Sequence, residues 1–213
     1  MSNLPSIERY LPFMFRSASF IEADLQAYAE LLNRWQSVQN LVSRETLSAL
    51  WERHFADSLQ LLPLLHSTDK IFRDLGSGGG FPALPLAIAC KGDGRHFHLV
   101  EPTARKVSFL RTVARELDLS VTVHGSRIEQ LDSRETPDVI TSRALASLPQ
   151  LCSWMAPFFG SKTRALLHKG KEHGEEVREA RAQWDFDVVE HRSDTDPAGV
   201  VLEISNLRER PTA

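Results

Sequence analysis

Long apolar runs are scarce in this chain of 213 residues. The longest, Phe81 to Cys90, is too short to cross a membrane and contains two prolines. Near the N-terminus, Arg16 interrupts the apolar stretch from Leu11 to Phe15, so no core of a signal peptide is recognisable. We therefore expect a cytoplasmic protein that does not enter a membrane.

Cysteine is nearly absent as well. The two that occur, Cys90 and Cys152, lie in apolar stretches and lack the spacing of a metal site. We interpret them as buried, reduced thiols of a cytosolic protein and expect no metal.

The chain also has no excess of positive charge. Its formal net charge is -3, so any contact with nucleic acid must come from a local basic patch. The length suits one sizeable domain, with room for an extension.

The most informative stretch present is Asp74-Leu75-Gly76-Ser77-Gly78-Gly79-Gly80-Phe81. Apolar residues before it predict a short strand over 70–73, and the apolar run after it predicts a buried helix over 81–90. A strand, a glycine loop and a helix in this order open a βαβ unit. Glycines let the chain turn sharply and let a ligand lie against bare main chain.

The spacing of these glycines indicates which ligand binds. The dinucleotide pattern Gly-x-Gly-x-x-Gly fails, because Phe81 or Ala83 stands where its last glycine is required. The pattern that fits is acid-x-Gly-x-Gly-x-Gly, built from Asp74, Gly76, Gly78 and Gly80. It resembles the first motif of Rossmann-like methyltransferases that use S-adenosylmethionine (AdoMet). A carboxylate here would repel a pyrophosphate and attract a sulfonium or an ammonium group. A tight turn without a ligand is the alternative.

The rest of the chain predicts an α/β fold with two parts. Residues 1–66 form a helical cap and residues 67–213 a methyltransferase domain, packed as one unit. Residues 1 to about 18 look loosely ordered because of Pro5 and Pro12. Two helices follow, one with the apolar stripe Ile21 to Trp35 and one over about 44–65, with Ser43 as its N-cap. Alternation then predicts strands at 95–101, 121–123, 138–142 and 164–168, helices at 103–117, 148–158 and 172–184, and an antiparallel pair at 186–190 and 200–206.

Within the cap, His54, Asp57 and Ser58 share a helix face. The three residues are too close in sequence to form a usual hydrolase triad, and no nucleophile elbow is present. We interpret the three as hydrogen-bonding the cap to the glycine loop, with a direct ligand or RNA contact as the alternative.

Two further segments follow strands whose carboxyl ends meet the glycine loop. Glu101 lies about twenty residues beyond the loop, where an acid can accept hydrogen bonds from both ribose hydroxyls. After the strand at 121–123, Ile128 is expected against the adenine ring, with Glu129 or its main chain at the exocyclic amine.

The strand at 138–142 ends at Arg143, where methyltransferases face the methyl group. The Asn/Asp-Pro-Pro-aromatic motif of amine methylation is absent, and neither cysteine has the context of a carbon-methylating nucleophile. The guanidinium of Arg143 suits a phosphate, a guanine edge or the AdoMet carboxylate, and a structural ion pair is the alternative. We expect it to position substrate or AdoMet.

The best basic stripe lies on the helix at 103–117. Its polar face carries Arg105, Lys106, Arg111 and Arg115, which either contact RNA or form a solvated face. Lys169, at another strand end, could touch an RNA phosphate or be an ordinary surface lysine.

Taken together, the motifs resemble those of the RsmG family, once called glucose-inhibited division protein B. The resemblance covers about residues 20–207 and rests on Asn40-Leu41-Val42-Ser43, Arg53-His54 with Asp57-Ser58-Leu59, the glycine loop with Phe81-Pro82, Arg105-Lys106 with Phe109-Leu110-Arg111, Ser142-Arg143-Ala144 and Lys169-Gly170. It implies a seven-stranded, mostly parallel sheet with an antiparallel last strand. It also implies that Gly76, Phe81, Ile128, Glu129 and Arg143 line the AdoMet site. Many members have glycine at the position of Ala83. Alanine adds only one methyl group there, and we expect AdoMet binding to be retained.

The resemblance implies methyl transfer from AdoMet to N7 of guanine 527, in the 530 loop of 16S ribosomal RNA. The small ribosomal subunit is then the partner, and we expect a monomeric enzyme. Two alternatives remain open from the residues: a methyltransferase acting on a small molecule or protein, and a nonenzymatic module that binds AdoMet or NAD.

Overall fold

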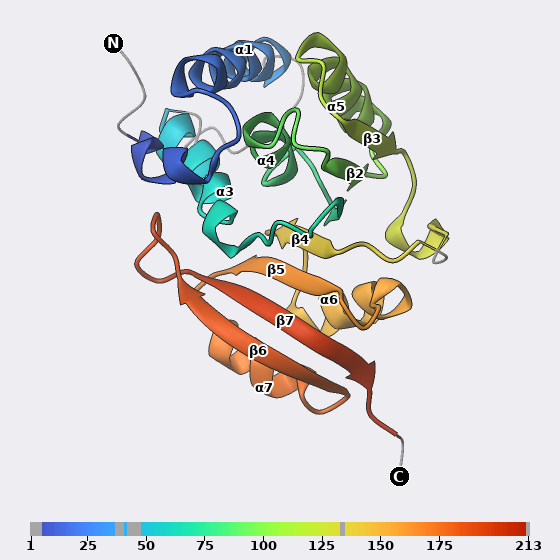
Figure 1. Ribbon diagram of the computed structural model, residues 1–213. Helices are drawn as coiled ribbons and strands as arrows, with labels where there is room; N and C mark the ends of the chain where they lie inside the picture. Colours follow the sequence, from blue (N-terminus) through green and yellow to red (C-terminus); the bar gives the residue numbers. More distant parts are fainter. Residues whose placement is uncertain (1–5, 37–40, 42–47, 133–134, 212–213) are drawn as a thin grey trace.

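A seven-stranded sheet forms the centre of the computed structural model, which describes residues 6–36, 41, 48–132 and 135–211. The strands lie in the order β3-β2-β1-β4-β5-β7-β6 (Figure 1). Their bounds are β1 (Ile71–Leu75), β2 (His96–Val100), β3 (Val121–His124), β4 (Val139–Arg143), β5 (Arg164–Lys169), β6 (Trp184–Arg192) and β7 (Val200–Glu209).

Strand direction follows from the pairing. The neighbours from β3 to β5 pair in parallel, whereas β7 is antiparallel to both β5 and β6. Strand β7 alone therefore runs against the others, which confirms the predicted sheet. The carboxyl ends of β1, β2, β4 and β5 meet at one edge, where ligands bind in open α/β sheets.

Helices cover both faces of the sheet. On one face, α1 (Ala18–Gln36), α4 (Ala83–Ala89) and α5 (Ala104–Glu116) share a core with Phe72 and Phe97. On the other, α6 (Leu148–Met155) and α7 (His173–Ala180) share a core with Ile140 and Leu167. Residues on both sides of position 66 contribute to the first core, and the division into two parts at that position remains a prediction.

The segment before α1 corrects one expectation. Residues 8–13 form the 3-10 helix η2 (Glu8–Phe13), and Ile7 and Tyr10 are buried. The Tyr10 hydroxyl donates to Oδ2 of Asp194 at 2.9 Å. Pro12 is compatible with this short helix. The prediction that this part of the chain is loosely ordered was therefore wrong for residues 8–13.

In the residues that the structure describes, the second cap helix is less regular than predicted and stops being α-helical before residue 65. Its described part consists of a π-helical turn η3 (Trp51–Ala56), a turn of α-helix α3 (Asp57–Leu59) and the 3-10 turn η4 (Leu62–Leu64). Pro63 has no N–H to continue an α-helix to residue 65. The proposed N-cap Ser43 lies outside the described residues.

The C-terminal elements correct another boundary. Helix α7 ends at Ala180, and Trp184 is the first residue of β6 rather than the last of a helix. Trp184 and Phe186 alternate into the second core, and this period of two is that of a strand. Two short 3-10 turns, η5 (Ile128–Gln130) and η6 (Ala156–Phe158), complete the fold.

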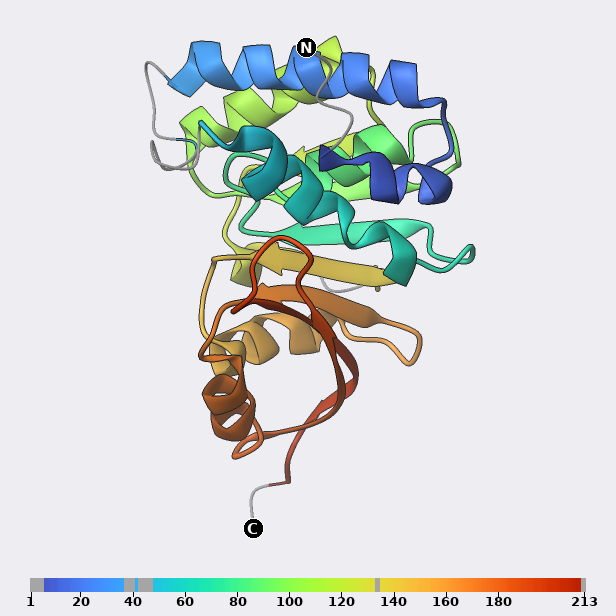
Figure 2. The same cartoon turned by 90° about the vertical axis from the view of Figure 1, so that its left-hand side faces the viewer.

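The loop between β6 and β7 reaches back to the cap. Figure 2 shows it below the turns of residues 51–64. The main-chain N–H of Asp194 donates to Oε1 of Gln60 at 3.0 Å, and the hydroxyl of Thr195 donates to Oδ1 of Asp57 at 2.6 Å. The first and last parts of the chain are thus joined at the edge of the sheet that carries the site.

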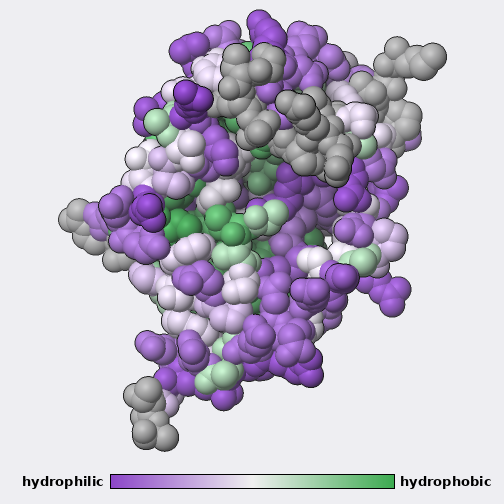
Figure 3. Space-filling model, turned by 180° about the vertical axis from the view of Figure 1, so that it is seen from behind, coloured by the Kyte–Doolittle hydropathy of each residue, from purple (hydrophilic) through white to green (hydrophobic). Residues whose placement is uncertain are grey.

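The surface seen from behind is mostly hydrophilic, with a small hydrophobic area near its middle (Figure 3). Among the described residues, no helix combines the length and the apolar character needed to span a bilayer.

Candidate cofactor and substrate site

The glycine loop joins β1 to α4 and has a backbone that larger residues would not adopt easily. Gly76 and Gly80 have φ of 67° and 97°, in the left-handed region. A Cβ on Gly80 would lie 2.7 Å from the hydroxyl oxygen of Tyr28, and one on Gly76 would meet Leu145. Both glycines are therefore required by the turn and by close packing around it.

Tyr28 anchors this loop from outside. Its hydroxyl donates a hydrogen bond to the carbonyl oxygen of Gly79, and its ring lies 5.4 Å from that of Phe81, centroid to centroid. Burial raises the pKa of Tyr28 well above its usual value, so the hydroxyl remains a donor. From the sequence, Tyr28 is one of the apolar stripe from Ile21 to Trp35 and nothing more, because a buried tyrosine with a distant partner leaves no local signal.

A cavity of about 370 Å³ opens over the loop. The glycine loop, the end of β2 and the exit of β4 contribute its walls, together with one residue of the connection after α1. The lining residues are Leu41, His54, Gly76, Ser77, Gly78, Gly79, Phe81, Glu101, Pro102, Lys106, Arg143, Ala144 and Leu145. The structure thus brings most of the predicted cofactor residues together.

Asp74 lies buried beneath the loop. Its Oδ1 accepts a hydrogen bond from the Thr141 hydroxyl at 2.7 Å, while Oδ2 has no partner among the residues that the structure describes. Burial raises the pKa of Asp74 to about 7, against the opposing effects of its hydrogen bonds and of Arg143. A carboxyl group with a spare acceptor oxygen fits the cationic end of AdoMet.

Glu101 faces the same loop from the end of β2. Its carboxylate accepts from the N–H of Gly78 at 3.0 Å and from the N–H of Thr103 at 2.9 Å. The side chain is therefore fixed with its oxygens at the cavity wall, where each oxygen can still accept another hydrogen bond. This placement is the one that ribose binding needs, and ribose binding itself stays a prediction.

The two residues expected at adenine lie elsewhere than in this wall. Ile128 packs with Leu75 and Val100 in the second core, and Glu129 accepts from the Trp154 indole N–H at 2.9 Å. Pro102 occupies the cavity wall on that side. An adenine contact by Ile128 or Glu129 remains a prediction that this arrangement does not test.

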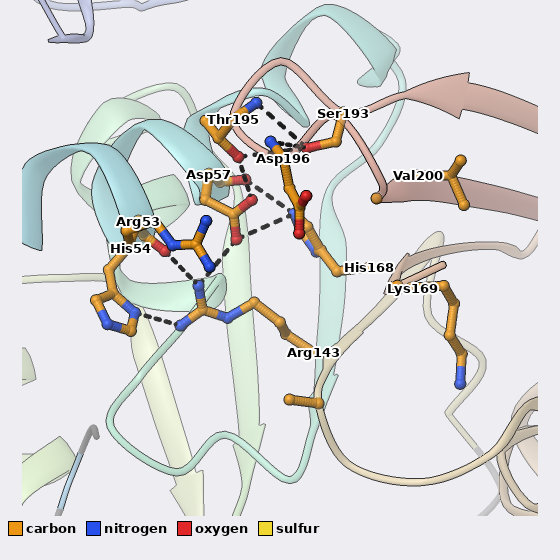
Figure 4. Close-up of a pocket in the computed structure, with 13 residues that line it drawn as sticks. Arg53, His54, Asp57, Arg143, His168, Lys169, Ser193, Thr195, Asp196 and Val200 are labelled. Carbon is orange, nitrogen blue, oxygen red and sulfur yellow. Dashed lines mark hydrogen bonds and ion pairs between the residues drawn. The ribbon is translucent and has the colours of Figure 1, made fainter. Parts of the chain in front are cut away.

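Arg143 connects the exit of β4 to the cap. Its guanidinium donates to the carbonyl oxygen of Arg53 at 3.1 Å, to Oδ2 of Asp57 at 2.9 Å and to Nδ1 of His54 at 2.7 Å. It also lies 5.0 Å from the centroid of the Phe81 ring. Figure 4 shows Arg143 among its partners Arg53, His54 and Asp57. Arg143 is thus the centre of an internal network at the cavity wall.

This network corrects the interpretation of the cap residues. His54 and Asp57 bond to Arg143 rather than to the glycine loop, although the His54 ring lies 4.7 Å from the Phe81 ring. Ser58 bonds to the carbonyl oxygen of His54 in its own helix at 2.6 Å. The hydrogen bond from the cap to the loop comes from Tyr28 instead.

Burial and neighbouring charges shift the pKa values of His54 and Asp57 in this network. Burial and the neighbouring Arg143 lower the pKa of His54 to about 4, so the ring is neutral at pH 7 and Nδ1 can accept. Burial alone raises the pKa of Asp57, but His168 and Arg143 more than offset this and the net pKa is lowered. The cluster therefore holds a carboxylate, a guanidinium and a neutral imidazole.

A second cavity, of about 380 Å³, adjoins the first and shares His54, Arg143 and Ala144 with it. Its other walls come from the cap, the end of β5, the β6–β7 loop and the start of β7. Those residues are Arg53, Asp57, His168, Lys169, Gly170, Ser193, Thr195, Asp196, Gly199 and Val200 (Figure 4). The sequence analysis missed this cavity, because its residues come from segments far apart in the chain.

The predicted RNA-contacting residues differ in their surroundings. On α5, Arg105 is exposed, Lys106 lines the first cavity, and Arg111 donates to the carbonyl oxygen of Val123 at 3.1 Å. Lys169 points away from the Arg143 network, and its ammonium bonds to the Ala146 carbonyl oxygen and to Glu176, each at 2.6 Å (Figure 4). An RNA contact by Lys169 stays a prediction, and two of the three donors of its ammonium are already used inside the protein.

Comparison with known proteins agrees with this geometry. Residues 21–196 match the family model described as "GidB: rRNA small subunit methyltransferase G". The chain is 44% identical over 187 residues to ribosomal RNA small subunit methyltransferase G of Bartonella henselae, covering 87% of this chain and 86% of the relative. The protein of the same name from Brucella ovis is 43% identical over 188 residues, with 87% and 88% covered.

Solved structures of methyltransferases share the fold. The ribosomal protein L11 methylase of Lactobacillus delbrueckii subsp. bulgaricus superposes with a TM-score of 0.56 at 16% identity, covering 72% of this chain and 78% of that one. The glycopeptide N-methyltransferase MtfA, solved with S-adenosylmethionine, gives 0.55 at 10% identity, covering 71% and 93%. At such identities the likeness shows the fold alone.

Proposed function

This chain belongs to the rRNA small subunit methyltransferase G family, and on that premise we propose that it transfers a methyl group from AdoMet to N7 of guanine 527 in 16S rRNA. The observation that carries the proposal is the pair of adjoining cavities. One is lined by the glycine loop and Glu101, with Asp74 beneath it, and the other lies on the far side of Arg143.

The first cavity has the features that AdoMet needs. Asp74 supplies negative potential beneath the loop, the bare main chain of residues 76–79 admits close approach, and Glu101 offers carboxylate oxygens to hydroxyl groups. When bound, AdoMet supplies an electrophilic methyl group on a sulfonium. The residues that line this cavity would hold and orient the cofactor beside the second cavity.

Methylation at N7 asks for no general base. The N7 lone pair of guanine is free at neutral pH and no proton leaves it, so the nitrogen attacks the methyl carbon while the bond from carbon to sulfur breaks. Catalysis then depends on in-line positioning at near-attack distance. His54 and Arg143, which line both cavities, are placed to position the two reactants.

The net charge bears on the form of the substrate. At -3, the chain has little overall attraction for naked RNA, whose nonspecific binding comes mainly from phosphate neutralisation. We infer that an assembled or partly assembled small subunit is preferred over free 16S rRNA.

We expect the enzyme to act as a monomer, since one copy supplies both cavities. We also expect it to act in the cytoplasm and without a metal. Among the described residues no group of three or more His, Cys, Asp or Glu side chains could hold a metal ion.

The proposal is tested by methyl transfer from labelled AdoMet to small subunits purified from a strain that lacks the enzyme. Nucleoside analysis should recover the label as 7-methylguanosine. Deproteinised 16S rRNA serves as the matched substrate, and we expect it to be methylated more slowly at physiological salt. Label in another nucleoside would contradict N7 transfer, and equal rates on both substrates would contradict the preference for the subunit.

A further inference from the structure

We infer that Asp196, in the loop between β6 and β7, reads the Watson–Crick edge of the target guanine in the second cavity. This inference rests on the proposed function. It starts from where the base must lie: because N7 receives the methyl group, the N7 edge faces the wall shared with the first cavity, which His54, Arg143 and Ala144 form.

The Watson–Crick edge, which adjoins the N7 edge at O6, then faces residues that line the second cavity alone. The loop of residues 193–199 supplies several of them, including Ser193, Thr195 and Asp196. The Watson–Crick edge of guanine carries the N1–H and N2–H donors, so recognition there requires acceptors. A carboxylate can accept from both donors at once.

Asp196 has an oxygen available for this. Its Oδ1 accepts from the Ala198 N–H at 3.0 Å, and Oδ2 has no hydrogen-bond partner within the described part of the chain. Figure 4 shows the side chain extending from the loop toward His168 and Arg143. A carboxylate in this position also disfavours a phosphate and adenine, whose N1 is an acceptor.

The loop that carries Asp196 is fixed in place. The two preceding residues, Asp194 and Thr195, are bonded to Gln60 and Asp57 of the cap. Inside the loop, Ser193 Oγ accepts from the Asp196 N–H at 3.2 Å and the Gly199 N–H donates to the Asp196 carbonyl oxygen at 2.9 Å. Preorganisation of this kind lowers the entropic cost of holding the base.

His168 adds a second acceptor at the same cavity. Its Nε2 lies 2.8 Å from the carbonyl oxygen of Asp57, so Nε2 carries the proton and Nδ1 has a lone pair. Nδ1 is buried and has no partner among the described residues, and burial lowers the pKa of the ring. This side of the cavity therefore contains one buried acceptor that no described residue uses.

Asp196 also matches the change in charge during the reaction. Methylation at N7 makes the base cationic, and its N1–H and N2–H become stronger donors. A carboxylate at that edge therefore binds the transition state more tightly than the ground state, which is the condition for acceleration.

The test compares Asp196→Asn with wild type on small subunits reconstituted with guanine or inosine at the target position, since inosine lacks the N2 amine. Asparagine keeps an oxygen for the Ala198 N–H, so the loop should fold. We expect wild type to prefer guanine about tenfold or more in kcat/KM, and the variant to lose most of this preference. AdoMet affinity should be unchanged.

Asp194→Asn is the matched control, because Asp194 lies in the same loop, bonds to Tyr10 and does not line this cavity. It should keep the preference for guanine. Wild type without a preference, or Asp196→Asn with the wild-type preference, would overturn the inference while leaving the methyltransferase proposal intact. Wild type that transfers no methyl group to the guanine subunits would overturn the proposed function itself.

Discussion

Ionisation of the buried Asp74 carboxyl group lowers the stability of the fold, whereas the proposed AdoMet site needs the ionised form. Because its pKa is raised from 3.8 to about 7, the folded protein keeps a proton that the unfolded chain has lost between these values. Stability therefore falls as pH rises from 3.8 to 7, and the penalty is complete above pH 7. The proposed AdoMet site calls for the same group in its charged form, beneath the loop and near the cationic end of the cofactor.

The variant Asp74→Asn separates these two effects. At pH 8 we expect it to be more stable than wild type by roughly 1–3 kcal/mol, since an amide carries no charge to bury. AdoMet should bind about tenfold more weakly, equivalent to ~1.4 kcal/mol. Chemical denaturation and calorimetric titration measure the two quantities.

The pH dependence of binding provides a stricter check. In wild type, AdoMet affinity should rise between pH 6 and 8 as Asp74 ionises. In Asp74→Asn, the increase in AdoMet affinity that comes from ionisation of Asp74 should be absent. Only the pH dependence that comes from titration of AdoMet itself should remain. Identical pH profiles for the two proteins would show that Asp74 does not face the cation.

Arg143 provides a test of geometry at constant charge. Its planar fork bonds to His54 and Asp57 at once, and a lysine cannot reproduce both contacts. We expect Arg143→Lys to lower kcat/KM by about tenfold or more, and Arg143→Ala to lower it further and to reduce stability. An alanine variant with wild-type AdoMet affinity and wild-type turnover would refute a positioning role.

Helix α1 holds the glycine loop with a hydrogen bond from the Tyr28 hydroxyl group, in addition to ring packing. Tyr28→Phe keeps the ring among Phe55, Phe81 and Phe109 and removes only the bond to the Gly79 carbonyl oxygen. We expect a loss of about 1 kcal/mol in stability and a few-fold weaker AdoMet binding, because the loop becomes less ordered.

Tyr10→Phe is the matched control for that change, since the Tyr10 hydroxyl bonds to Asp194, away from the glycine loop. It should leave AdoMet affinity at the wild-type value. Equal weakening by both substitutions would mean that the Tyr28 hydroxyl has no specific effect on the loop.

The regular elements were largely predictable from the sequence, and the irregular ones were not. Alternating or wholly apolar runs place β1 to β5 within about two residues, because burial decides those patterns. The turns η2 and η3 depend on tertiary partners such as Asp194 and Arg143, which lie far along the chain. No local pattern carries that information.

The same distinction holds for the site. Asp74, the loop glycines and Glu101 follow from spacing along one βαβ unit, and in the structure Gly76, Gly78 and Glu101 line one cavity while Asp74 lies beneath it. The second cavity unites segments from the cap, β4, β5 and the β6–β7 loop, so its acceptors at His168 and Asp196 emerge only from the folded chain.

The whole molecule should be sensitive to acid because several histidines are held neutral. Burial is the largest cause of the lowered pKa at His54 and His98, each to about 4, and at His124 and His168. Between pH 6.5 and 4 the unfolded chain binds protons that the folded one does not, so stability falls as pH falls through this range.

Thermal unfolding at pH 7.5, 6 and 5 checks this prediction, with variants that act in opposite directions. His98→Gln should make the loss of stability in acid shallower than in wild type. Asp74→Asn should make it steeper, because the opposing gain from protonating Asp74 is removed. A melting temperature that does not change from pH 7.5 to 5 in wild type would contradict the assignment of neutral histidines.

The central claim concerns one atom of one nucleotide, and it can be measured directly. Small subunits methylated in vitro are reduced and treated with aniline, which cleaves the strand at 7-methylguanosine, and primer extension locates the break. We predict a single break at position 527 that requires both the enzyme and AdoMet. A subunit that remains uncleaved there, with AdoMet shown to bind the enzyme, would contradict it.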